Sequence, residues 1–283
     1  MVLLVMGVAS QFVFWCTDFI KLLTDRSLYV LRFDNRDAGK STQLSDFGNP
    51  AVVRMMLPEW LSLGEQLVYT LDDLMEDAVS LLRALHISAA HWVGMSMGSM
   101  ICQLATIHYP QVVKSLTCMM STTGESNLPS PKLSLQLQFL KKPKSDERED
   151  VVSFHANFLR TVLTPEEISM NLARKPYELS FNRCGVLMSS KGARERHIAA
   201  VVRAKPRAEQ LRQVRGIPSL VLHGSEDPLV PIIHGYRLAE CLHQSRLVVL
   251  VGMGHYFTPK HFENVADEVM NTVVRGETSP GGR

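Results

Sequence analysis

A serine lies between two glycines in the segment Gly94-Met95-Ser96-Met97-Gly98, which follows a β-branched, aromatic run and precedes an apolar helical pattern. This G-x-S-x-G pattern is typical of a sharp turn from a strand into a helix. Such a turn projects the serine hydroxyl out of the fold and places helix N–H groups beside it. The chemistry that suits this arrangement is nucleophilic attack by Ser96 on an acyl group.

Acyl transfer also needs a base that removes the serine proton and a carboxylate that orients the base. Of the ten histidines, only His255 follows a late apolar run through a Gly-x-Gly turn. An acid after the preceding strand completes the order serine, acid, histidine that one catalytic architecture uses. We predict that Asp227 is this acid, with Glu226 as the neighbouring alternative and His223 as the alternative base.

Two backbone N–H groups are expected to stabilise the oxyanion that forms during attack. One belongs to Met97, the residue after the nucleophile, and the other to a loop after an early strand. In this chain Gly7 permits a sharp turn after the first apolar run, which makes the N–H of Val8 the candidate. An ordinary glycine turn without a catalytic role is the alternative.

The elements that must position these residues are short apolar runs, each followed by a helical pattern. Runs that are apolar at nearly every position are typical of strands buried on both faces of a parallel sheet. We predict six such strands, at Val2–Met6, Leu28–Phe33, Ala90–Gly94, Lys114–Met120, Ser219–His223 and Arg246–Val251. Helices are predicted at Leu71–Leu85, where Thr70 and Asp73 suit a capping box, and at Met97–Tyr109 and His261–Val274. This alternation predicts an α/β fold.

The alternation stops between about Ser121 and Gly216, where amphipathic helices such as Asp150–Leu163 replace it. We therefore predict a core formed by residues 1–120 and 217–275, a helical cap at 121–216 and a disordered tail at 276–283. Residues 141–215 hold 16 Lys or Arg and 9 Asp or Glu. Solvated helix faces are the favoured interpretation of this surplus, and attraction of anionic substrates is the alternative.

Composition excludes several classes of protein. Thirty basic and 28 acidic residues give a net charge of +2, which does not suggest binding to nucleic acid. The five scattered cysteines are typical of reduced thiols in a cytoplasmic protein, and neither C-x-x-C nor H-E-x-x-H marks a metal site. No apolar stretch approaches the roughly 20 residues that cross a bilayer, and the apolar first residues lack the basic start of a secretion signal.

The chain resembles α/β-hydrolase-fold serine esterases over nearly its whole length. Phe33–Ser41 is similar to their D-x-R-G-x-G-x-S loop, with Asp37 where glycine is usual. Val5–Val8 resembles the V-M-G-G oxyanion segment of the aclacinomycin methylesterase-like subgroup, with Val8 in place of the second glycine. Met119–Gly124, Asp227–Pro231 and Gly252–His255 also match that subgroup. The resemblance implies catalysis by Ser96, His255 and Asp227, a helical cap and no cofactor.

The chain departs from the family at its start. Family members usually carry an antiparallel strand pair before the segment that begins here at Val2. Without that pair the strand at Leu28–Phe33 would form an exposed apolar edge, which favours self-association. A truncated gene model, an alternative start and a minimal variant would each explain the difference.

The leading functional hypothesis is hydrolysis of a small or apolar carboxylic ester through an acyl-serine intermediate. Apolar side chains near the motifs suit such a substrate, although core packing is the simpler explanation for at least half of them: Met95, Met97, Met100, Met253 and Phe257. One alternative is an aminopeptidase of the proline iminopeptidase type, which needs carboxylates for the substrate amine and has only Glu166 and Glu167 as candidates. The other is a non-catalytic binding protein on the hydrolase fold.

Overall fold

The computed structural model describes residues 1–55, 61, 66–138, 141–164, 169–185 and 192–278. Its centre is a parallel sheet of six strands in the order β2-β1-β3-β4-β5-β6. The six predicted strands are all confirmed, with ends that differ by at most two residues. They are β1 (Val2–Val5), β2 (Val30–Arg32), β3 (Ala90–Met95), β4 (Val113–Met119), β5 (Ser219–Gly224) and β6 (Ser245–Leu250).

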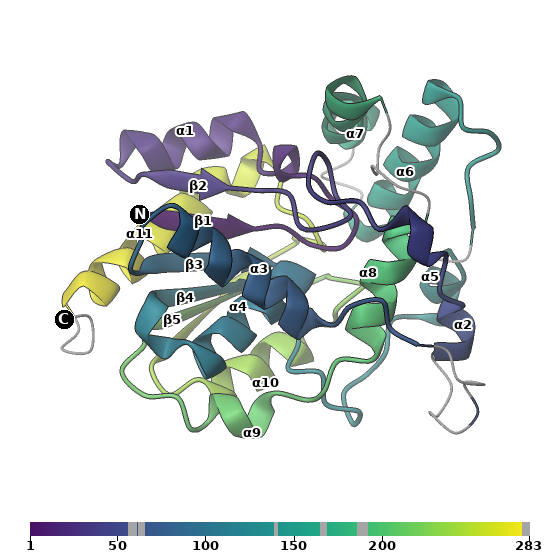
Figure 1. Cartoon of the computed structure of the whole chain (residues 1–283). Helices are drawn as coiled ribbons and strands as arrows, with labels where there is room; N and C mark the ends of the chain where they lie inside the picture. Colours follow the sequence, from purple (N-terminus) through teal and green to yellow (C-terminus); the bar gives the residue numbers. More distant parts are fainter. Residues whose placement is uncertain (56–60, 62–65, 139–140, 165–168, 186–191, 279–283) are drawn as a thin grey trace.

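Helices cover both faces of this sheet (Figure 1). On one face lie α1 (Thr17–Asp25) and α11 (Phe262–Thr278); on the other lie α3 (Leu71–Ala84), α4 (Met97–His108), α9 (Ala208–Leu211) and α10 (Ile233–Cys241). Side chains of β1 alternate between two apolar cores, one shared with α1 and α11 and the other with α3 and α4. Burial on both faces explains why this strand is apolar at every position.

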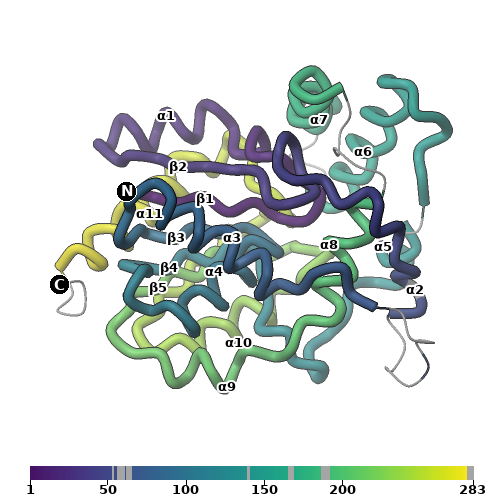
Figure 2. The backbone as a smooth tube through the Cα atoms, viewed as in Figure 1, coloured from purple at the N-terminus to yellow at the C-terminus, as the bar shows by residue number. Residues whose placement is uncertain are grey.

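The segment between β4 and β5 carries the helices that the sequence assigns to a cap. Four of them lie beyond the carboxyl ends of the strands (Figure 2), and the last of the four contacts the short helix α2 (Val52–Met55). They are α5 (Leu133–Gln138), α6 (Arg148–Val162), α7 (Met170–Cys184) and α8 (Ala193–Val202). The fifth, α9, contacts α4 and α10 instead and so belongs with the helices that cover the sheet. Short 3-10 helices occupy Phe12–Phe14, Ser45–Phe47, Pro110–Val112 and Pro259–His261.

Two local predictions agree with the structure. The capping box at the start of α3 is confirmed, because the Thr70 hydroxyl accepts from the Asp73 N–H and the Asp73 carboxylate accepts from the Thr70 N–H. The strand expected at the sheet edge is also there, since among the described strands β2 pairs with β1 alone, and its side chains are half-buried.

The prediction of a disordered tail at 276–283 is wrong for residues 276–278. Helix α11 continues to Thr278, because Gly276 packs against the Lys114 backbone and Glu277 binds the side chains of His91 and Lys114. Residues 279–283 lie outside the described part of the chain. Among the helices that the structure describes, none combines the length and apolar character needed to cross a membrane.

Candidate active site

Ser96 occupies the turn between β3 and α4, as the motif predicts. Its backbone lies at φ 55° and ψ −121°, in the region of positive φ that residues other than glycine rarely adopt. A Cβ at position 98 would lie 2.1 Å from the Val5 carbonyl oxygen, and one at position 94 would lie 2.4 Å from the Gly98 carbonyl oxygen. Both positions therefore require glycine, since a larger residue would push the turn away from the sheet.

The structure brings Ser96, His255 and Asp227 together from three separate loops at the carboxyl ends of the strands. His255 Nε2 lies 3.1 Å from Ser96 Oγ, and His255 Nδ1 lies 2.7 Å from Asp227 Oδ2. Because a carboxylate only accepts hydrogen bonds, Nδ1 carries the ring proton and Nε2 is left free to accept the serine proton. The arrangement has the geometry of a nucleophile, a general base and an orienting acid.

Backbone contacts fix the two partners of the serine. The second carboxylate oxygen of Asp227 accepts from the N–H groups of Leu229 and Val230, at 2.9 and 2.8 Å. The N–H of His255 donates to the carbonyl of Val162 at the end of α6, at 2.7 Å. The acid is therefore held by its own turn, whereas the base is held by a cap helix.

Of the two alternatives weighed from the sequence, His223 lies beside this set, with its Nε2 3.6 Å from Asp227 Oδ2. Glu226 is exposed to solvent. His223 is buried and its Nε2 lies 2.7 Å from the carbonyl oxygen of Val230, so its ring faces a backbone turn. Burial lowers the pKa of His223, which keeps the ring neutral near pH 7.

The proposed oxyanion donors lie beside the nucleophile. Met97 is the first residue of α4, so its N–H has no acceptor within the helix. Val8 follows β1, and a Cβ on its neighbour Gly7 would lie 3.2 Å from Ser96 Cβ, which shows how closely this loop approaches the nucleophile. Within the described residues, no hydrogen bond uses the N–H of Val8.

Two cavities meet at Ser96, and both are also lined by Val8 and Leu229. The smaller, of about 120 Å³, reaches His255 and has aromatic walls from Phe14, Phe154, Phe158, Tyr177 and Tyr256. The larger, of about 390 Å³, has walls from Met100, Leu128, Ile198, Val201 and Val202. Among the described residues, His255 lines the smaller cavity and not the larger.

Some apolar residues expected near the substrate belong to the core instead. Met95 lines the smaller cavity and Met100 lines the larger one. The remaining three are fully buried: Met97, Met253 and Phe257. The aromatic walls were not identified from the sequence, because Phe14, Tyr177 and Tyr256 come from segments whose patterns do not show that they converge.

Half of the ten arginines at 141–215 form ion pairs with described residues: Arg174, Arg183, Arg194, Arg196 and Arg212. Arg174 pairs with Glu149 and Glu178, Arg194 with Glu195, and Arg212 with Glu209. These pairs support the interpretation of the basic surplus as ordinary helix surface. Within the described residues, no group of three or more His, Cys, Asp or Glu side chains is arranged to hold a metal ion.

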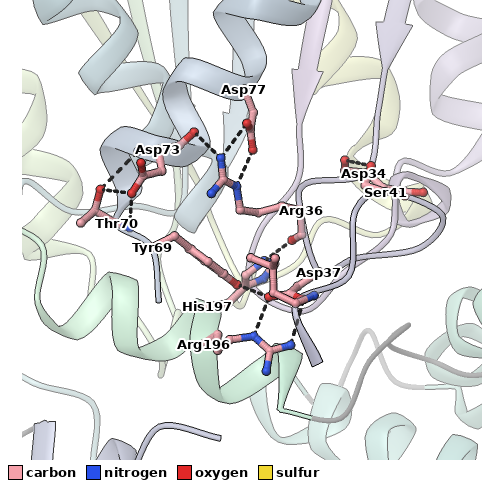
Figure 3. Close-up of polar contacts among 11 residues, drawn as sticks. Asp34, Arg36, Asp37, Ser41, Tyr69, Thr70, Asp73, Asp77, Arg196 and His197 are labelled. Atoms are coloured by element: carbon pink, nitrogen blue, oxygen red, sulfur yellow. Dashed lines mark hydrogen bonds and ion pairs between the residues drawn. The ribbon is translucent and has the colours of Figure 1, made fainter. Parts of the chain in front are cut away.

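One polar network that the sequence did not predict joins the cap to the core (Figure 3). Asp37, in the loop after β2, receives two hydrogen bonds from Arg196 of α8, at 2.7 and 2.8 Å. Both side chains are fully buried, and the Tyr69 hydroxyl donates to the same carboxylate at 2.9 Å. The next residue of α8, His197, contacts backbone atoms of Arg36 and Ala9.

Comparisons with known proteins agree with this arrangement. Residues 1–261 match the family described as alpha/beta hydrolase fold. The chain is 25% identical over 263 residues to rhodomycin D methylesterase DauP of Streptomyces sp. (strain C5), covering 85% of this chain and 80% of that protein. It is 25% identical over 237 residues to 2-hydroxymuconate semialdehyde hydrolase of Pseudomonas sp. (strain CF600), covering 80% and 78%.

Solved structures also share the fold. A putative non-heme bromoperoxidase BpoC from Mycobacterium tuberculosis H37Rv superimposes with a TM-score of 0.70 at 16% identity, over 96% of this chain and 92% of that one. The meta-cleavage product hydrolase of Pseudomonas fluorescens IP01 superimposes with a TM-score of 0.69 at 20% identity, over 96% and 89%.

Proposed function

Because this chain belongs to the alpha/beta hydrolase fold family, we propose that it is a carboxylic ester hydrolase that acts through an acyl-serine intermediate at Ser96. The observation that carries the proposal is the continuous chain of contacts from Ser96 Oγ through His255 to Asp227. Relatives named as methylesterases support the ester as the reacting bond.

The geometry supports the following sequence of steps. His255 Nε2 takes the proton of Ser96 while Oγ forms a bond to the ester carbonyl carbon. The N–H groups of Val8 and Met97 stabilise the negative charge on the carbonyl oxygen. As the carbon–oxygen bond to the alcohol breaks, His255 returns the proton to the leaving oxygen. Water then attacks the acyl-serine with His255 again as base, which releases the acid and restores Ser96.

The two cavities suggest which part of the ester lies where. Because His255 must reach the leaving oxygen, the alcohol belongs in the cavity that His255 lines, and the acyl group in the other. An apolar cavity of about 150 Å³ is known to admit benzene. The alcohol-side cavity, at about 120 Å³, is smaller than that, while the acyl-side cavity reaches about 390 Å³. We therefore propose a bulky apolar acid esterified with a small alcohol as the substrate class.

The aminopeptidase alternative has little support near Ser96. A substrate amine needs a carboxylate that is free to pair with it, and Glu125 is the carboxylate in the lining of the larger cavity. Its two oxygens already accept from Arg237 at 2.8 and 2.7 Å, and this contact lowers the pKa of Glu125 to about 2. Glu166 and Glu167, the candidates from the sequence, lie outside the described residues.

The first experiment tests the nucleophile. Wild type and Ser96→Ala are assayed with methyl acetate and with proline p-nitroanilide, and labelled with a fluorophosphonate. We expect ester turnover and labelling by the wild type alone. Turnover of the anilide without the ester would favour the peptidase. Folded wild type without turnover or labelling would favour the non-catalytic alternative.

The second experiment tests the assignment of the cavities with two isomeric esters. Methyl 2-naphthylacetate places the rings in the acyl group, and 2-naphthylmethyl acetate places them in the alcohol. We expect kcat/KM to favour the methyl ester by about tenfold or more, a difference of about 1.4 kcal/mol in transition-state stabilisation. The opposite preference would reverse the assignment without removing the esterase proposal.

A further inference from the structure

The loop that carries the Val8 N–H is bound by a side chain of the cap. The N–H of Ala9, the residue after Val8, donates to His197 Nδ1 at 3.0 Å. Ala9 has φ +59°, in the left-handed region that favours glycine. A residue persists in such a conformation only when its surroundings hold it there. His197 is therefore placed to maintain the conformation of the loop next to the nucleophile.

The two contacts of the His197 ring define its protonation. Because the Ala9 N–H can only donate, Nδ1 must be the unprotonated nitrogen. Nε2 then carries the proton and donates to the carbonyl oxygen of Arg36 at 2.8 Å. The ring is fully buried, and this burial lowers the pKa of His197 to about 4. Near pH 7 the ring is thus a neutral bridge between two backbone loops.

Neighbouring groups hold the ring itself in position (Figure 3). Arg196, the preceding residue of α8, forms the buried ion pair with Asp37. The ring of Tyr69 packs edge-on against that of His197, with centroids 6.0 Å apart. The side chain of Arg36 binds Asp77 of α3 through two hydrogen bonds, which anchors the loop whose carbonyl oxygen accepts the hydrogen bond from Nε2.

We propose that His197 is a positioning residue for the reaction at Ser96, because its Nδ1 holds the 7–9 loop so that the Val8 N–H faces the developing oxyanion. This inference rests on the proposed ester hydrolysis. An oxyanion donor must lie within about 2.7–3.1 Å of the charged oxygen, and loss of one donor costs about 10²- to 10³-fold in kcat. Relaxation of the loop would displace the donor rather than delete it, so the expected loss is smaller.

Two amide substitutions separate the two contacts of the ring. The amide oxygen of asparagine lies one bond from Cγ, as His Nδ1 does, so His197→Asn keeps an acceptor for the Ala9 N–H. The amide of glutamine lies one bond farther out, near Nε2, so His197→Gln keeps only the contact with Arg36. We expect His197→Gln to lose about 10- to 100-fold in kcat with little change in KM, and His197→Asn to stay within about fivefold of wild type.

A tetrahedral inhibitor and a matched control test the cause of the loss. Binding of phenylboronic acid, which places a negative oxygen in the oxyanion site, should weaken in His197→Gln by about the same factor as kcat. Tyr69→Phe removes one hydrogen bond from the same network and leaves the Ala9 contact. We expect this control to lower the melting temperature and leave kcat unchanged.

The outcomes distinguish the two proposals. Wild type that hydrolyses no ester would overturn the proposed function. Active wild type with a His197→Gln variant of equal kcat would overturn the role of His197 alone, and so would a loss of kcat in Tyr69→Phe as large as that in His197→Gln. If His197→Gln fails to fold, the kcat of folded His197→Asn decides the question. A loss of more than tenfold in kcat in that variant would contradict the role of Nδ1 as the acceptor for the Ala9 N–H.

Discussion

Replacing Arg196 with methionine should destabilise the protein by about 3–5 kcal/mol, because it leaves the buried Asp37 carboxylate without its cation. Both side chains of the pair are 0% exposed, so water cannot replace the guanidinium. Burial alone would raise the pKa of Asp37, but hydrogen bonds from Arg196, the Leu44 N–H and Tyr69 outweigh it and lower the pKa from 3.8 to about 2. This difference corresponds to about 2–3 kcal/mol of stabilisation at neutral pH.

The sign of this linkage gives a second, independent expectation. A carboxyl group whose pKa is lower in the folded state stabilises the fold above its ordinary pKa, here 3.8, and loses that contribution as the pH falls toward 2. The gap in unfolding free energy between wild type and Arg196→Met should therefore be largest near pH 8 and should shrink as the pH falls, because the buried carboxyl takes up a proton more readily once its cation is gone. At pH 3 it should be smaller by at least about 1 kcal/mol.

Urea unfolding measures this gap, with the fluorescence of the buried Trp15 and Trp92 as the signal. The control is Arg174→Met, which makes the same side-chain change in another cap helix. Arg174 pairs with Glu149, whose side chain is 68% exposed, so its loss should cost less than about 1 kcal/mol. The reasoning is refuted if Arg196→Met costs no more than Arg174→Met, or if the gap does not change between pH 7 and pH 3.

Three further changes test the site. Gly98→Ala should unfold or inactivate the protein, since its Cβ would lie 2.1 Å from the Val5 carbonyl oxygen; a wild-type melting temperature and turnover would contradict the tight turn. Asp227→Asn should lower kcat about 10⁴-fold in a folded protein because the amide favours the wrong His tautomer, and steady-state kinetics with only a few-fold loss would remove Asp227 from its role. Val201→Trp, which fills the larger cavity, should cut kcat/KM for methyl 2-naphthylacetate about tenfold or more while sparing methyl acetate. Equal effects on the two esters would argue against acyl binding there.

Much of the fold could be predicted because its strands are buried on both faces. Such strands leave uninterrupted apolar runs, and each residue of the serine, acid and histidine set follows one of them in the chain. Their approach in space then follows from the parallel sheet, since carboxyl ends of parallel strands share one edge. The prediction of Ser96, Asp227 and His255 thus used order along the chain and needed no knowledge of side-chain packing.

The network in the cap could not be predicted in this way. Arg196 and Asp37 are 159 positions apart, and an arginine in an amphipathic helix has the appearance of solvated surface. The signal available in the sequence is Asp37 itself, a charged residue where the family pattern has glycine. In the structure this position lies at φ +64°, which explains the usual glycine. The error at the C-terminal tail has a similar cause, because the contacts of Gly276 and Glu277 with the sheet leave no local pattern.

The buried pair of Asp37 and Arg196 also limits which substitutions the protein can tolerate during evolution. A lone replacement of either residue leaves an uncompensated charge in the interior, so most single steps should be removed by selection. Homologues in which position 37 returns to glycine should therefore have exchanged Arg196 for an uncharged residue as well. An alignment would reveal this as a correlated substitution between the loop after β2 and helix α8, two segments that are distant in sequence.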